Sequence, residues 1–290
     1  MKNYIRTLSI LLVSTLLSYC AACSKDDDAS TLSTIGTIDP GNDPNFKIVE
    51  NTDTGFTGFN RKVEVFDIPI YAVAAVEDVK LLHAANVMAQ YLDNDEDGVI
   101  DNQAVVTAMK NNNAFLFLWK NESDLETLEP PSNAEGQDLG NDETIPGWHT
   151  NGHTGRFDAA LEEVLHIITH TGYASAYPEV FGEHVGTDLA NAMDIARGGQ
   201  FTTIPNPYPD EAWYTYDDTT CDYNCMTTEY IYWSLTSMLG AQENRLNEIN
   251  QEWRLNTRTL VENTDTAVYA LLTDTQYKFP VVLPDGSYKQ

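Results

Sequence analysis

The sequence predicts a mostly helical α+β protein, a helical body with a small β component at its N-terminal side. With 290 residues and 42% hydrophobic content, the chain can bury a substantial core. Residues 60–73 alternate apolar and polar side chains as strands do. Several later stretches repeat their apolar residues at helical spacing, and no internal repeat is visible. We therefore expect a single globular domain over residues 46–290.

The first half of this domain is expected to contain the strands. Residues 60–73 predict one or two strands, and Pro69 indicates an edge or a bend. The other expected elements are helices at 76–92 and 102–110, a strand at 114–119 and a short helix at 123–128. Residues 129–150 hold three prolines and three glycines and predict a long loop.

The second half is expected to be helical. Helices are predicted at 156–173, 186–197, 226–240, 241–254 and 259–273, followed by an extended end. An aromatic loop at 205–218 interrupts them. Its rings suit either sugar stacking or cover of the core.

The N-terminus has the features of an export signal. Lys2 and Arg6 precede an apolar run over residues 8–17, which is too short to span a bilayer. The stretch resembles a bacterial lipoprotein signal, which implies a signal peptide over 1–22 and cleavage and acylation, for example by palmitate, at Cys23. The alternative is an unlipidated secreted protein.

The residues after Cys23 extend this resemblance. Residues 24–28, Ser-Lys-Asp-Asp-Asp, resemble the acidic export tag of surface lipoproteins of Bacteroidetes. The resemblance implies a lipid anchor in the cell outer membrane and exposure at the cell surface. Residues 23–45 are rich in Ser, Thr, Asp, Gly and Pro and predict a flexible tether.

Charge and cysteine content narrow the function classes. A formal net charge of -28 argues against nucleic acid and anionic lipid headgroups as partners, and it suits cation binding. In an exported protein, Cys221 and Cys225 are expected to form a short disulfide.

Residues 93–101, Asp-Asn-Asp-Glu-Asp-Gly-Val-Ile-Asp, resemble the EF-hand calcium loop. The expected Ca²⁺ ligands are side chains at alternate positions and one backbone carbonyl, from Asp93, Asp95, Asp97, Val99 and Asp101. The loop would extend to residue 104, where Ala104 replaces the bidentate glutamate of the family. We expect a structural calcium site.

Residues 156–173 form the most informative stretch. At helical spacing, Glu162, Glu163, His166 and His170 share one side, with apolar residues opposite. His166 and His170 are one turn apart, as metal ligands on a helix are. Position 167 is Ile, where an H-E-x-x-H peptidase helix that began at His166 would need glutamate.

Two further histidines precede this helix. His149 and His153 are also four residues apart, and four of the six histidines lie between positions 149 and 170. We expect them to meet His166 and His170 in one cavity, as a site for Zn²⁺ or another divalent transition metal or for proton transfer. The active-site region is expected over residues 147–218.

The leading hypothesis is β-elimination on a uronate-containing oligosaccharide, by a carbon–oxygen lyase of the dehydratase kind. This reaction needs a base, an acid for the leaving oxygen, and a cation that stabilises the enolate-like intermediate. The candidates for proton transfer are His153, His166, His170 and Tyr173. Arg197 either supplies the cation or caps its helix.

Two alternatives stay open. The first is a zinc-dependent hydrolase or peptidase that uses His166 and His170 as ligands and Glu163 as base or third ligand. The second is a glycan-binding lipoprotein without catalysis. The segments EEVLHIITHTGYASAYPEVFG and AMDIARGGQF resemble unclassified dehydratases of ulvan-oligosaccharide breakdown. Together with surface lipoproteins of polysaccharide-utilisation systems, this resemblance implies a carbohydrate substrate and favours elimination.

Overall fold

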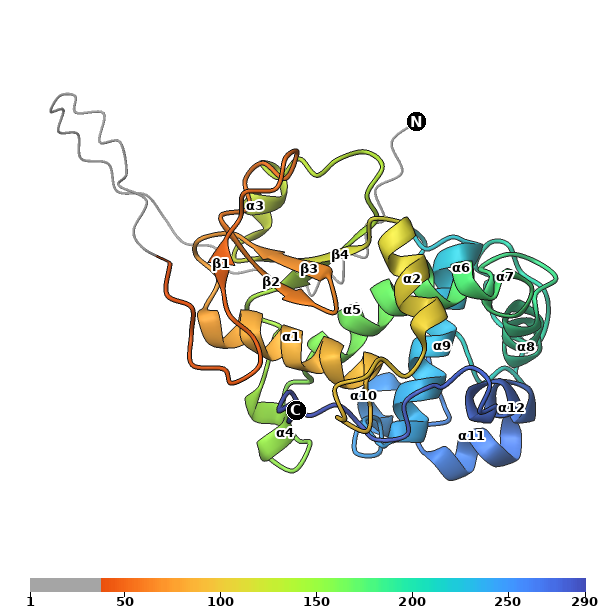
Figure 1. The fold of residues 1–290 in the computed structure, drawn as a ribbon. Helices are drawn as coiled ribbons and strands as arrows, with labels where there is room; N and C mark the ends of the chain where they lie inside the picture. Colours follow the sequence, from red (N-terminus) through yellow and green to blue (C-terminus); the bar gives the residue numbers. More distant parts are fainter. Residues whose placement is uncertain (1–37) are drawn as a thin grey trace, which may run out of the picture. The chain divides into compact units, whose positions relative to one another are not determined.

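A five-stranded mixed sheet organises the first half of the computed structural model, which describes residues 38–290 (Figure 1). Its strands lie in the order β1-β2-β3-β4-β5, antiparallel through β3 and parallel from β3 to β5. They are β1 (Val49–Glu50), β2 (Arg61–Val65), β3 (Ile68–Ala72), β4 (Phe115–Trp119) and β5 (Gly136–Gly140). The predicted α+β class is confirmed. The signal peptide 1–22 and the lipidated Cys23 lie outside the described residues, as does most of the tether.

Two helices make the crossover between parallel strands β3 and β4. A parallel pair cannot be joined by a hairpin, and here α1 (Asp78–Leu92) and α2 (Gln103–Asn111) form the connection. Every residue of α1 from Leu81 onward is buried, because the helix is covered by the sheet, by α5 and by the C-terminal segment. The expected helices and strand of this region are confirmed.

Strand β5 was not expected, because its sequence, GQDLG, predicts a loop. It contains two glycines and no β-branched residue, so intrinsic preference does not favour a strand. Pairing with the apolar strand β4 overrides that preference. A methyl group at Gly136 would lie 2.2 Å from the Phe115 ring, so the glycine lets the two strands approach.

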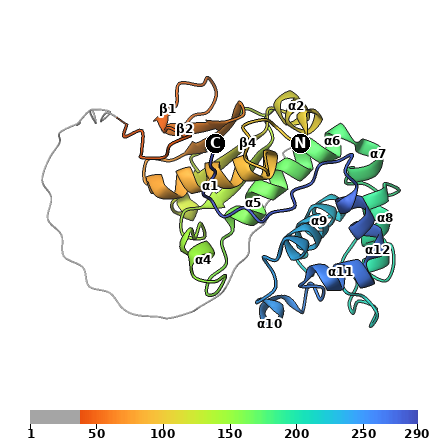
Figure 2. The ribbon, with the colours of Figure 1, turned by 60° about the horizontal axis from the view of Figure 1, so that its bottom comes forward.

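The central helix predicted over 156–173 is found in two parts, α5 (Ala160–Ile167) and a π-helix (Ile168–Tyr173). The short helix α6 (Ala174–Ala176) follows the π-helix directly. Helix α5 contacts α1 and β5 on one side and α9 on the other, so it joins the sheet to the second half of the described residues (Figure 2).

The second half of the described chain is built from helices. They are α7 (Pro178–Phe181), α8 (Asp188–Ala196), α9 (Tyr223–Leu239), α10 (Leu246–Ile249), α11 (Arg258–Thr264) and α12 (Thr266–Thr273); two short helices, α3 (Glu122–Leu125) and α4 (Gly147–Thr150), precede α5. Helix α9 ends as expected at Gly240, which caps it in the left-handed conformation with φ +92°. Of the helix expected at 241–254, only α10 is found, and the segment around it consists of turns. Cys221 and Cys225 lie at disulfide distance, with Cα atoms 5.3 Å apart. Within residues 38–290, no helix is long and apolar enough to span a bilayer.

Gly172 offers a test of the packing between the π-helix and α2. A methyl group there would lie 2.7 Å from Val105 Cγ1 and 3.1 Å from Met109 Cγ. We expect Gly172→Ala to lower the free energy of unfolding by about 1–3 kcal/mol through overpacking. Gly147→Ala is the matched control, because nothing lies within 4 Å of its added methyl. Equal stability of the two variants in urea denaturation would contradict this packing.

Candidate metal centre

Three side chains from α5 and α9 converge where the two helices pack. Glu162 and His166 are one turn apart on α5, and Glu229 comes from α9. Each offers a metal-ligand atom, and the three atoms lie within 4.8 Å of one another. His166 and Glu229 are buried, whereas Glu162 is partly exposed. The group therefore has the donor set and the compactness of a divalent metal site.

The imidazole of His166 carries the strongest indication of a ligand. Its Nε2 is buried and has no hydrogen-bond partner. It faces Glu229 Oε2 at 3.6 Å, which is too long for a hydrogen bond. Two ligand atoms that share a tetrahedral ion at ~2.0–2.1 Å lie about 3.3 Å apart. The separation of Nε2 and Oε2 is thus close to that of two atoms bound to one ion.

Glu163 borders the centre and is held by the sheet. Gln137, on β5, donates from Nε2 to Glu163 Oε2 at 2.6 Å. The same carboxylate oxygen lies 3.5 Å from His166 Nδ1. The Tyr232 ring on α9 packs edge-on against the His166 ring. Glu163 is therefore oriented by a side chain of the sheet, and the His166 ring is supported by α9.

The charges of the centre are not balanced by the described residues around it. Burial raises the pKa of Glu162, Glu163 and Glu229, and the neighbouring carboxyl groups add to the effect. Three carboxylates beside one imidazole are costly to bury as anions. A divalent cation would offset that cost and would displace their protons.

Two signals in the sequence point to this centre, and the spacing of the histidines alone does not reveal them. Glu162-Glu163-Val164-Leu165-His166 matches H-E-x-x-H with glutamate in the first ligand position. This match starts at Glu162, four residues before the His166 start at which the sequence analysis tested the H-E-x-x-H pattern. Glu229 is the only charged residue among the 17 of α9, and an acid in such a helix indicates a buried partner.

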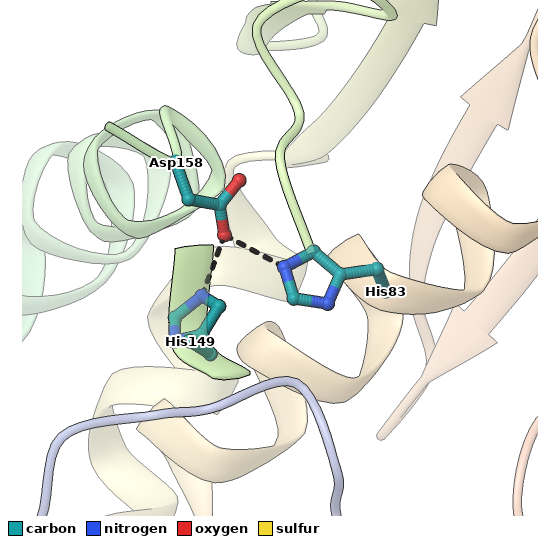
Figure 3. A group of neighbouring side chains, drawn as sticks. All are labelled: His83, His149 and Asp158. Atoms are coloured by element: carbon teal, nitrogen blue, oxygen red, sulfur yellow. Dashed lines mark hydrogen bonds and ion pairs between the residues drawn. The ribbon is translucent and has the colours of Figure 1, made fainter. Parts of the chain in front are cut away.

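The histidines before α5 form a different cluster. His149 Nε2 and His83 Nε2, from α4 and α1, both lie at hydrogen-bond distance from Asp158 Oδ2, at 2.8 and 2.7 Å (Figure 3). The other Asp158 oxygen accepts from the Ile145 amide at 2.7 Å. These distances fit hydrogen bonds to a shared carboxylate. His83 and Asp158 were not predicted as site residues.

His153 does not join His166 either. Its ring stacks on Trp148 with centroids 4.3 Å apart and lies 6.2 Å from the His149 ring. Within residues 38–290, no hydrogen bond, ion pair or ring contact links His149 or His153 to His166 or His170. The expected meeting of four imidazoles is therefore not found.

His170 does not join His166 in the centre. It lies within the π-helix Ile168–Tyr173, and Glu183 engages its ring. His170 Nδ1 pairs with Glu183 Oε2 at 2.6 Å. Burial opposes its charged form, but Glu183 outweighs it and raises the pKa of His170.

Tyr173 and Arg197 occupy structural positions. The Tyr173 hydroxyl donates to the carbonyls of Tyr277 and Lys278, and the ring stacks on Phe279. Arg197 is fully buried, caps α8 and donates to the Phe201 carbonyl at 2.6 Å. Of the two roles expected for Arg197, an exposed arginine at a helix C-cap or a cation aimed at a substrate anion, the structure shows the C-cap position, but with the side chain buried rather than exposed.

The acidic loop after α1 holds the third group of metal-ligand type in the described residues, after the α5–α9 centre and the His83–His149–Asp158 cluster. Asp93, Asp95 and Asp97 offer oxygens within 4.8 Å of one another. Asp93 is buried and accepts from the Gly98 amide at 2.8 Å and from the Tyr288 hydroxyl. Asp101 Oδ2 accepts from the Asn94 amide, also within the loop. The described residues thus contain groups that could hold a metal ion, as expected, without defining which metal.

No protein-family model matches this chain, and neither the comparison with curated proteins nor the comparison with solved structures finds a match.

Asp158 should contribute to stability in a pH-dependent way. Burial favours its protonated form, but hydrogen bonds from His149 and His83 outweigh burial and hold the pKa of Asp158 well below its usual range. A carboxylate with a lowered folded-state pKa stabilises the fold above its unfolded pKa, and this contribution is lost as the pH falls through the folded value. We expect Asp158→Asn to cost about 2–4 kcal/mol at neutral pH.

The difference in free energy of unfolding between wild type and Asp158→Asn should shrink below about pH 4. Asp210→Asn, at an exposed site, is the control and should change stability by less than about 0.5 kcal/mol. Urea denaturation across pH measures both. A difference that persists unchanged in acid would show that Asp158 is not the ionised acceptor.

Proposed function

We propose that this protein is a metal-dependent hydrolase of the peptidase kind, with Glu162, His166 and Glu229 as ligands of a divalent metal such as Zn²⁺. The observation that carries the proposal is the buried, unpartnered His166 Nε2 facing the Glu229 carboxylate at 3.6 Å. Two ligands four apart on one helix, a glutamate between them and a third ligand from another helix support this class.

The chain's residues have distinct roles in this proposal. When bound, a divalent ion supplies a Lewis acid that polarises a carbonyl and acidifies water. Glu163 is assigned as general base from its place directly after the first ligand in the Glu-Glu-x-x-His pattern; its Oε2 lies 3.5 Å from His166 Nδ1, the ring nitrogen that does not face Glu229. Gln137 keeps Glu163 oriented through their 2.6 Å hydrogen bond.

The position of β5 favours an extended peptide as substrate. β5 is the last strand of the sheet, and its Gln137 contacts Glu163. The Phe115 amide donates to the Glu135 carbonyl, and the Asn141 amide donates to the Trp119 carbonyl. Along β5, the amides and carbonyls of odd-numbered residues therefore point toward β4. Those of Gly136 and Asp138 therefore face away from the sheet, where a peptide can pair with them.

The other hypotheses from the sequence define competing outcomes. Elimination on a uronate oligosaccharide and glycan binding remain predictions, and the internal contacts of Tyr173 and Arg197 give elimination no added support. The proposed place of action is the cell surface, with Cys23 as lipid anchor.

Metal content and peptide hydrolysis test the proposal together. We expect about one zinc per chain in zinc-treated protein after dialysis, and at least ~10-fold weaker binding in His166→Ala and Glu229→Gln. Glu163→Gln should keep its zinc and lose about 10²–10⁴-fold in kcat/KM for peptide cleavage, because only the base is removed. Elemental analysis and release of new amino termini measure the two effects.

His184→Gln is the control for these variants, because His184 is exposed and lies outside the ligand group. It should keep both zinc and activity. Zinc retained in both ligand variants would contradict the centre. An absorbance rise from 4,5-unsaturated uronate, without new amino termini, would replace the hydrolase by a lyase. Retardation by polysaccharide alone would favour a binding protein.

We also propose that the loop at 93–101 binds structural Ca²⁺. The C-terminal segment is tied to this loop, since Tyr288 donates to Asp93 and the Val281 amide donates to Asn94 Oδ1. Calcium should therefore stabilise the fold by about 2–3 kcal/mol at ~100-fold its Kd. Asp95→Asn should reduce the gain without affecting the calcium-free protein, because Asp95 is exposed.

Thermal unfolding with calcium and with a chelator measures this effect. Asp210→Asn, which removes one carboxylate elsewhere, should respond to calcium as the wild type does. An equal calcium response in Asp95→Asn would show that the ion acts at another place.

A further inference from the structure

The side of the central helix that solvent reaches carries two carboxylates and one imidazole. Over residues 160–173, the three side chains that are not buried are Glu162, Glu163 and His170. Glu162 is a ligand of the proposed centre and Glu163 its base, and the buried His166 lies between them and His170 along the helix. A substrate that approaches the centre along this side therefore meets His170 as well.

Contacts with α9 place His170 one helical turn beyond the metal centre. The ligand His166 packs edge-on against the Tyr232 ring. One turn before Tyr232 on α9, the Thr228 hydroxyl donates to Glu183 Oε1 at 2.7 Å. The other oxygen of this carboxylate lies 2.6 Å from His170 Nδ1. His170 is thus tied to α9 at a point roughly 5–6 Å along the helix axis from His166.

Glu183 determines which nitrogen of His170 is available to a substrate. The Glu183 side chain is 9% exposed, whereas that of His170 is 32% exposed. Nδ1 is engaged by the carboxylate, and no hydrogen bond from another described residue engages Nε2. A carboxylate on one ring nitrogen fixes the orientation of the imidazole and leaves the other nitrogen free to act. His170 Nε2 is therefore the accessible atom.

The charges around His170 favour its protonated form. Within the described residues, the charged groups that act on its ring are Glu183 and, just before β5, Glu135. Burial disfavours the imidazolium, but these two carboxylates outweigh burial and raise the pKa of His170. His170 thus presents a positive charge and an N–H donor on the side of the helix where the other accessible groups are acidic.

The course of β5 leads a paired peptide past the centre and toward His170. The Ala159 amide donates to the Glu143 carbonyl at 3.1 Å, and Gln137 donates to Glu163 at 2.6 Å. Later residues of the helix therefore meet earlier residues of the β5 segment. The start of β5 accordingly lies in the direction of His170, and a peptide along its free edge runs the same way.

We infer that His170 is a further catalytic residue of the proposed hydrolase, whose Nε2–H donates a hydrogen bond to the scissile carbonyl oxygen as that oxygen becomes negatively charged. Glu183 is its positioning residue, and Thr228 holds Glu183. This inference rests on the proposed function. A donor that is fixed in place before the reaction stabilises such a charge without reorganisation.

The proposed step is balanced without any further reactant. A water oxygen bonds to the carbonyl carbon, one electron pair of the C=O bond moves to the carbonyl oxygen, and Glu163 takes a proton from the water. When the C–N bond breaks, its electron pair goes to nitrogen, which takes the proton from Glu163, and the oxygen re-forms the C=O bond. His170 keeps its own proton throughout and acts as a hydrogen-bond donor.

The first test compares peptide cleavage by zinc-loaded full-length variants. We expect His170→Gln to keep its zinc and to lose about 10²–10³-fold in kcat/KM, as when one donor to a developing oxyanion is removed. The loss should fall on kcat rather than on KM, because the hydrogen bond strengthens only as charge develops. His184→Gln, which alters an exposed histidine next to Glu183, should be unchanged. Equal kcat/KM in His170→Gln and wild type would overturn the inference.

Glu183→Gln tests the positioning role through pH. This variant keeps a hydrogen-bonding side chain and removes the charge, so the pKa of His170 should fall. An NMR titration of the zinc-loaded protein measures that pKa, with the His170 signal identified by its loss in His170→Gln. Because the imidazolium is the active form, the decline of kcat with rising pH should move to lower pH in Glu183→Gln. An unchanged pKa and an unchanged pH profile would contradict the role of Glu183.

Equilibrium binding keeps the two proposals distinguishable. The probe is a peptide phosphinate, whose tetrahedral anion imitates the charged oxygen, and the reference is the matching amide peptide bound to Glu163→Gln. His170→Gln should weaken phosphinate binding at least ~10-fold and, in the Glu163→Gln background, amide binding by less than about threefold.

Each combination of results decides between the two proposals. If no peptide is cleaved but the phosphinate binds and His170→Gln weakens that binding, the hydrolase fails and the anion-binding role of His170 stands. If peptides are cleaved and His170→Gln changes neither kcat nor phosphinate binding, the hydrolase stands and the role of His170 fails. A wild type that does not bind the phosphinate also overturns the role of His170.

Discussion

The burial of acidic side chains between α5 and α9 is the constraint on which the rest of the structure depends. Glu229 is almost completely buried in a helix that is otherwise uncharged, and it faces an imidazole whose Nε2 has no hydrogen-bond partner. Carboxylates in such a place are tolerated when a cation compensates them. The helices that pack there also join the sheet to the helical half, so the centre sits at the junction of the fold.

The elements around the junction have related roles. The crossover through α1 and α2 makes β3 and β4 parallel, and β5 pairs parallel to β4 as the last strand of the sheet, in contact with α5. Gln137 reaches Glu163 from the sheet, while the Tyr232 ring packs on His166 from α9. The cluster of His83, His149 and Asp158 ties α1 and α4 to the start of α5. It orders the N-terminal end of the helix that carries the ligands.

Local sequence was sufficient for the helices and strands with clear periodicity and for the cysteine pair. It was insufficient where tertiary contacts decide. GQDLG becomes a strand only because β4 lies beside it, and His170 pairs with Glu183, a partner that helical spacing does not indicate. The metal centre was partly predictable from the sequence, since Glu163 and His166 were among the expected site residues. Glu229 and Asp158 were not, because their importance depends on burial that spacing along the chain does not reveal.

The most direct test of the metal centre is an anomalous difference map at the zinc absorption edge, from crystals of the zinc-treated protein. We predict a peak bounded by His166 Nε2 and by the carboxylates of Glu162 and Glu229. A peak confined to the loop at 93–101 or to the His83–Asp158–His149 cluster, or no peak at all, would contradict the centre.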